Sequence, residues 1–200
     1  MKRFQRIVIP AALTLAMLTG CGAVSGQSGT STAAVSSTAV VENAAVDTDG
    51  LFSQRDLEQS WDENTAVRIE LTGDTASSDS DAVQIDGGTV TITSEGVYVL
   101  SGTLSNGSII VDARDEDKVQ LVLNGVSVTS SDFAAIYAKN ADKVFVTLAE
   151  NTENTLVNES DMTEIDDNHV DAVIFSKCDL TLNGAGELTV TSPAGHGIVS

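Results

Sequence analysis

The chain has 200 residues, of which 42% are hydrophobic and only 4% aromatic, and it carries a formal charge of −19. This length holds one domain with appendages, whose core must be built from small aliphatic side chains. A protein this acidic lacks the basic surface that displaces counterions from nucleic acid, so nucleic acid is excluded as a partner.

The first 20 residues form a predicted targeting segment. Three basic residues stand before the apolar stretch Ile7–Leu18, which is too short to span a bilayer, and small residues then lead to Cys21. This pattern resembles a bacterial lipoprotein signal. It predicts residues 1–20 as a signal peptide, Cys21 as the point of lipid attachment, and an extracytoplasmic protein anchored to the cell membrane.

Two segments of unlike composition follow. Residues 21–46 are almost entirely Ser, Thr, Ala, Gly and Val, which cannot bury a core and predict a flexible tether. Residues 47–66 place large apolar side chains among charged ones, as in a short amphipathic helix or an irregular N-terminal cap, and we favour the cap. Trp61, the sole tryptophan, is interpreted as a packing residue rather than a sugar-stacking platform.

From residue 67 onward, short apolar runs alternate with Gly, Asn and Asp, and no stretch gives a convincing helix. The pattern predicts an all-β fold. The predicted strands are Val67–Leu71, Thr89–Ile92, Val97–Leu100, Ser108–Val111, Val119–Leu123, Ala135–Ala138, Val144–Leu148, Ala172–Ser176, Leu180–Leu182 and Leu188–Val190.

Repeated sequence motifs narrow the choice among all-β folds further. Leu-x-Leu-Asn-Gly occurs at Leu121 and again at Leu180, and Val-Thr-Ser follows each copy at Val128 and Val190. Isoleucine recurs at steps of 26, 38 and 24 residues, at Ile110, Ile136, Ile174 and Ile198. The long step is explained if residues 158–170 are an inserted loop. Repeats near 25 residues with short strands are typical of a solenoid, so residues 67–200 are predicted to form a parallel β-helix.

The alternation of side chains along each predicted strand then indicates which residues lie on the outer face of the solenoid. If Ile136 and Ile174 point inward, their neighbours in sequence point outward, and equivalent residues of successive turns lie side by side. An aromatic column beside a basic column is expected on the surface. The predicted carbohydrate contacts are Tyr137, Lys139, Phe175 and Lys177, although the inserted loop could instead cover the two aromatic rings.

Several segments between Leu51 and Ser200 resemble a family of bacterial carbohydrate-binding domains. The resemblance implies a right-handed parallel β-helix, calcium on its acidic surface, and affinity for polysaccharides such as cellulose or acidic, pectin-type sugars. Family members continue past the position of Ser200, so the chain is expected to be an incomplete β-helix. The segments are Arg55–Gln59, Gly96–Leu104, Ile109–Ala113, Asp117–Gly125, Ala135–Tyr137, Asp142–Val144, Leu148–Leu156, Phe175–Lys177 and His196–Ile198.

Acidic residues give the candidate calcium ligands, because calcium prefers several hard oxygen ligands. Asp166 and Asp167 belong to the inserted loop, Asp171 directly follows it, and Asp112 begins an acidic turn before it. The loop lacks the spacing of an EF-hand, so a merely solvated acidic surface is the alternative.

The leading functional hypothesis is non-catalytic, calcium-assisted polysaccharide binding at the cell surface. One alternative is a pectate-lyase-like β-eliminase, in which Lys139 or Lys177 abstracts a proton beside a calcium-bound carboxylate. A second alternative is a structural adhesin that binds a protein partner.

Overall fold

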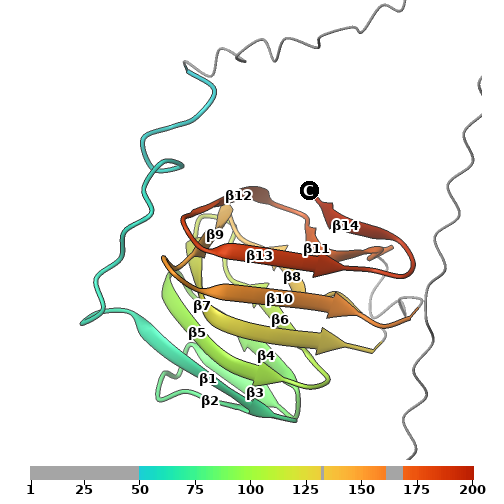
Figure 1. The fold of residues 1–200 in the computed structure, drawn as a ribbon. Coiled ribbons are helices and arrows are strands. Elements are labelled where there is room, and N and C mark those ends of the chain that lie inside the picture. The colour runs from blue at the N-terminus through green and yellow to red at the C-terminus, as the bar shows by residue number, and fades with distance from the viewer. Residues whose placement is uncertain (1–49, 132, 161–168) are drawn as a thin grey trace, which may run out of the picture. The chain divides into compact units, whose positions relative to one another are not determined.

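The computed structural model describes residues 50–131, 133–160 and 169–200, and every regular element within these ranges is a β-strand (Figure 1). The predicted all-β class is therefore confirmed. In this part of the chain we find no helix with the length and apolar character needed to cross a membrane.

The larger sheet, which we call sheet A, has the strand order β12-β9-β7-β5-β1-β2. Two further strands extend it, because β10 pairs with the second half of β7 and β13 pairs with β10. Its strands are β1 (Val67–Gly73), β2 (Ala76–Ser77), β5 (Gly96–Leu104), β7 (Lys118–Ser130), β9 (Lys143–Leu148), β10 (Glu153–Asn158), β12 (Asp179–Gly184) and β13 (Glu187–Thr191).

The smaller sheet, sheet B, has the order β14-β11-β8-β6-β4-β3. One core cluster contains side chains from both sheets, such as Leu121 and Ile136, so the sheets pack on each other through aliphatic residues. The strands of sheet B are β3 (Val83–Asp86), β4 (Thr89–Ile92), β6 (Ser108–Asp112), β8 (Ile136–Asn140), β11 (Ala172–Ser176) and β14 (His196–Val199).

The prediction of a right-handed parallel β-helix is wrong. The strands form two separate, mixed sheets, and neither sheet closes on itself. The pairs β1–β2 and β3–β4 are antiparallel, whereas the other pairs are parallel. The parallel pairing therefore does not include β2 and β3, which form the N-terminal edges of the two sheets.

A tight hairpin gives the physical reason for the antiparallel edge of sheet B. Asp86 pairs with Thr89, so only Gly87 and Gly88 connect β3 to β4. Gly87 has a φ of 55°, which glycine adopts without steric cost and which two-residue hairpin turns require. The Gly-Gly pair thus turns the chain back before the parallel strands begin.

The register of the parallel strands confirms part of the predicted column. Ile174 pairs with Ile136 on one side and with Ile198 on the other. The first member was wrong by one residue, because Ile109 pairs with Ile136 and is buried, whereas Ile110 pairs with Tyr137.

The Leu-x-Leu-Asn-Gly copies are not equivalent in the sheet. Leu121 and Leu182 both pair with Val146, so the second copy is shifted by two residues relative to the first. A shift of two keeps the same side chains facing the core, because side chains in a strand alternate with a period of two. The motif therefore marks the inner face of sheet A rather than an exact repeat.

Residues 50–66 form an irregular segment, which we call the strap, that contacts the outer face of sheet A. The guanidinium of Arg55 donates to Gln120 Oε1 of β7 at 2.8 Å and lies 4.3 Å from the centre of the Phe145 ring in β9. Asn183 of β12 donates to the backbone oxygens of Asp56 and Glu58. The strap thus crosses three strands of sheet A, namely β7, β9 and β12.

Asp56 carries the main electrostatic contact of the strap. Its carboxylate lies 2.6 Å from Lys143 Nζ and accepts hydrogen bonds from Ser53 and Thr181. The Lys143 ammonium, followed by the two hydroxyls, holds the pKa of Asp56 well below its ordinary value of 3.8. A carboxyl group with a depressed pKa stabilises the fold above its unfolded-state pKa and loses that contribution as the pH falls.

We therefore expect the strap to loosen as the pH falls below 3.8, where Asp56 loses the advantage of its charged form. Trp61 lies in the strap, so its fluorescence reports the change. Asp56→Asn should show the altered emission already at neutral pH. Identical emission curves for the variant and the wild-type protein between pH 7 and pH 2 would contradict this assignment.

Candidate functional site

The predicted aromatic residues lie in one cross-strand row on sheet B. Ile110 pairs with Tyr137, Tyr137 with Phe175, and Phe175 with Val199, so four neighbouring strands contribute to the row. Ile110, Tyr137 and Phe175 belong to a cluster separate from the main core, which places them on the outer face of the sheet. The predicted pairing of the two aromatic residues is confirmed.

The two rings differ in accessibility. Tyr137 is 2% exposed, because Phe133 and Val170 pack on it, and the Phe133 ring meets it edge to face with 5.5 Å between centres. Phe175 lies 6.0 Å from Tyr137 and is half-buried. Of these two rings, Phe175 therefore offers more surface to a ligand, and Tyr137 packs beside it on the neighbouring strand.

The two predicted lysines follow these aromatic residues and behave differently. Lys139 Nζ lies 2.7 Å from Asp112 Oδ2, across an irregularity in the pairing of β6 with β8. Lys177 comes directly after β11, and its backbone N–H donates to the Ala138 oxygen. Lys139 is thus held by Asp112 of the neighbouring strand, whereas Lys177 lies just beyond the end of β11.

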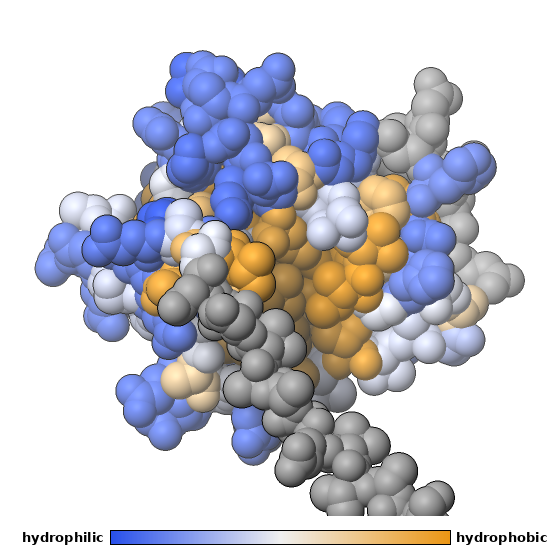
Figure 2. All heavy atoms as spheres, turned by 90° about the horizontal axis from the view of Figure 1, so that it is seen from above, coloured by the Kyte–Doolittle hydropathy of each residue, from blue (hydrophilic) through white to orange (hydrophobic). Residues whose placement is uncertain are grey.

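Lys177 lines an open hollow of about 540 Å³ with Lys143, Cys178, Asp179 and Leu180. Cys178 packs against the core, and burial raises the pKa of its thiol. The strand edges nearby expose apolar side chains, and Figure 2 shows apolar surface bordered by polar groups when the molecule is seen from above. Leu182 is 39% exposed there and Ile198 44%.

Lys177 also differs from the other described basic residues in its ion pairing. Seven Lys and Arg side chains lie among the described residues, and six of them form ion pairs with carboxylates. Lys177 has no acidic partner within residues 50–131, 133–160 and 169–200. An exposed ammonium without a partner is able to bind an anionic ligand without breaking an existing pair.

The predicted calcium ligands are not brought together in the described part of the chain. Asp112 pairs with Lys139, and Asp171 lies on the surface with its carboxylate 3.7 Å from His196. Within that part no group of three or more His, Cys, Asp or Glu side chains is placed to hold a metal ion. Asp166 and Asp167 lie outside the described residues.

Sequence reasoning missed Lys143, the second basic residue at the hollow. Its ammonium is held by Asp56, which lies 87 residues away in the chain. No local pattern around either residue signals this contact, because it depends on the path of the irregular strap.

These features define a class of protein, namely an all-β domain whose candidate site is an open sheet face. Residues 86–200 match the family model of carbohydrate-binding domain-containing proteins, and the chain belongs to this family. A relative from Acetivibrio thermocellus, also described as a carbohydrate-binding domain-containing protein, is 32% identical over 199 residues. The match covers 97% of this chain and 59% of the relative.

A solved structure is also similar to this chain. It is described as the polysaccharide lyase-like protein from C. thermocellum, in a gadolinium derivative. The two chains are 36% identical with a TM-score of 0.64, and the likeness covers 66% of this chain and 55% of the other. The present chain thus spans little more than half of the proteins it resembles.

Proposed function

We propose that the protein holds polysaccharide at the outer surface of the cell without cleaving it. Membership of the carbohydrate-binding family supports the ligand class. The lipoprotein-like signal before Cys21 supports the location, with residues 21–46 as the tether between lipid and domain.

The proposed ligand is a glycan that carries carboxylates, and Lys177 is its principal contact. The Lys177 ammonium carries this proposal, because it has no acidic partner among the described residues and offers a positive charge on a strongly acidic protein. Phe175, two residues before Lys177 in the chain, provides ring surface for a sugar, and the hollow beside Lys177 gives the glycan room to lie.

Replacing Lys177 with alanine should weaken binding of a galacturonate hexasaccharide by about two- to fivefold, the effect of one exposed ion pair. Calorimetric titration at low salt measures it, and the difference should shrink as salt screens the charges. Lys118→Ala removes an equal charge that is already paired with Asp142, so this control should bind normally. Equal affinities for all three proteins would overturn the assignment of Lys177.

Calcium assistance belongs to the same proposal. The described carboxylates do not make a calcium site by themselves, so the ligands would come from the acidic loop that contains Asp166 and Asp167, together with Asp171. Bound calcium would bridge protein carboxylates to those of the glycan. Repeating the titration with calcium and then with a chelator tests this, and unchanged affinity would remove calcium from the proposal.

The solved structure similar to this chain is described as polysaccharide lyase-like, which keeps β-elimination as the second candidate. A sample of the same protein with polygalacturonate and calcium distinguishes the two functions. Binding alone predicts no growth of ultraviolet absorbance from unsaturated products, and steady growth would establish a lyase. Absence of binding to any sugar on a glycan array would favour an adhesin for a protein partner instead.

A further inference from the structure

The strap brings a carboxylate to the hollow that Lys177 lines. Lys143 lines this hollow too, and its Nζ lies 2.6 Å from Asp56 Oδ1 of the strap. The Lys143 side chain is 21% exposed, against 54% for Lys118 and 42% for Lys139, which also have carboxylate partners. Among the described residues, the hollow therefore has one ammonium without an acidic partner, that of Lys177, and one that Asp56 already occupies.

The two oxygens of the Asp56 carboxylate have different partners. Oδ1 faces Lys143 and accepts a hydrogen bond from Thr181 Oγ1 at 2.7 Å. Oδ2 accepts from the backbone N–H and the hydroxyl of Ser53, at 2.9 and 2.7 Å, so it shapes a turn of the strap. This turn holds Oδ1 in place before any ligand arrives. A carboxylate that must associate from solution competes poorly with one already positioned in the same chain.

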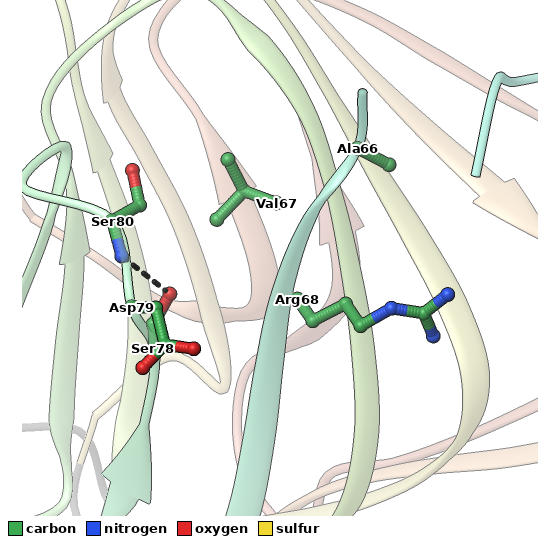
Figure 3. Close-up of a pocket in the computed structure, with 6 residues that line it drawn as sticks. All are labelled: Ala66, Val67, Arg68, Ser78, Asp79 and Ser80. Carbon is green, nitrogen blue, oxygen red and sulfur yellow. Dashed lines mark hydrogen bonds between the residues drawn. The ribbon is translucent and has the colours of Figure 1, made fainter. Parts of the chain in front are cut away.

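The other end of the strap is held more weakly. The strap joins β1 at Ala66, beside a hollow of about 440 Å³, and Figure 3 shows Arg68 extending away from Ser80 of that hollow. The Arg68 guanidinium lies 3.7 Å from the Glu63 carboxylate, and the two side chains are 71% and 73% exposed. Exposed ion pairs contribute little to stability. Asp56, which is 8% exposed, is therefore the stronger ionic contact of the strap.

Asp56 also sets the charge at the hollow beside Lys177. The charged side chains that line this hollow are Lys143, Lys177 and Asp179, and Asp179 is in register with Lys143 on the neighbouring strand. With Asp56 in contact, the positive and negative charges of these side chains balance. Without Asp56, one positive charge remains in excess, which favours an anionic ligand.

We propose that the strap is an autoinhibitory segment, in which Asp56 is an internal anion that competes with a carboxylated ligand for Lys143. This inference rests on the proposed function, because it concerns regulation of the acidic-glycan contact at Lys177. With the strap in place, the hollow binds the glycan through Lys177. Once the strap is released, Lys143 provides a second ammonium for the same ligand.

Calorimetric titration of the whole protein tests this competition. At low salt, Asp56→Asn should bind a galacturonate hexasaccharide about two- to fivefold more tightly than the wild-type protein, the effect of one additional exposed ion pair. The amide has the shape of the carboxylate but no charge. Asp56→Asn combined with Lys143→Ala removes both charges of the pair, so its affinity should return to that of the wild-type protein.

Glu63→Gln is the matched control for net charge. It removes an equal charge from the same strap, but beside Arg68 rather than beside the hollow of Lys177. This variant should bind the hexasaccharide as the wild-type protein does. A gain as large as that of Asp56→Asn would show a general charge effect and contradict the competition for Lys143.

Labelling of lysine amines with an acylating reagent, followed by mass spectrometry, gives a readout that needs no glycan. Asp56→Asn should raise the rate at Lys143, and an unchanged rate at Lys118 would show that the fold is intact. Equal Lys143 rates in the two proteins would refute the strap contact itself. Glycan binding by the wild-type protein without a gain in Asp56→Asn would overturn this inference and leave the proposed function intact, whereas no binding by any of these proteins would overturn both.

Discussion

Replacing Asn154 with alanine should destabilise the domain by about 2–4 kcal/mol, because it removes a buried amide and leaves backbone groups without partners. Asn154 is 1% exposed, and its Oδ1 accepts from the backbone N–H groups of Gly125 and Val126, both at 3.0 Å. Its Nδ2 donates to Thr152 Oγ1 and to the backbone oxygen of Glu187. One side chain thus joins β7, β10 and the start of β13.

Chemical denaturation followed by far-ultraviolet circular dichroism measures this loss. Asn106→Ala is the matched control, because Asn106 is exposed and its amide oxygen accepts one hydrogen bond, from the Ser131 N–H. The control should cost under about 1 kcal/mol. Similar losses for both variants would show that the buried bonds of Asn154 do not stabilise the domain beyond those of a surface amide.

The same asparagine explains an error in the predicted strands. The Asn-Gly pair at Asn124–Gly125 suggests the end of a strand, and we predicted that strand to stop at Leu123. The structure continues β7 to Ser130, because Asn154 satisfies the two amides that the irregular step exposes. A partner 29 residues away leaves no mark on the local sequence.

Local patterning was sufficient where a strand alternates strongly. Thr89–Ile92 and Ala172–Ser176 begin and end where they were predicted, because their apolar side chains recur at every second position or fill a buried run. Strand β10, Glu153–Asn158, was not predicted, since Glu and Asn are depleted in strands. Asn154 and Asn158 are nevertheless buried in this strand, because tertiary hydrogen bonds of their side chains override that preference.

The candidate site was also predictable from the sequence only in part. The register that places Tyr137 beside Phe175 follows from the repeat, so the sequence predicts it. The exposure of those rings does not follow, because Phe133 and Val170 cover Tyr137 from segments outside its strand. The position of Trp61 was also beyond prediction, since the strap has no periodic pattern that assigns it to the outer face of sheet A.

Replacing Gly102 with alanine should cost about 3–5 kcal/mol, from backbone strain together with a steric clash. Gly102 has a φ of +93°, and a Cβ there would overlap the backbone oxygen of Leu71 in the neighbouring strand. Because the obstacle is backbone, relief would require β1 and β5 to separate.

Gly73→Ala separates strain from clash. Gly73 has a φ of +84°, yet a Cβ at this position would have nothing within 4 Å, so only the conformational cost of about 1 kcal/mol applies. The difference between the two variants in denaturant unfolding therefore measures how tightly β1 and β5 are held together. Equal destabilisation would mean that β1 and β5 separate at little cost in free energy. The edge of sheet A would then be too flexible to keep a fixed shape.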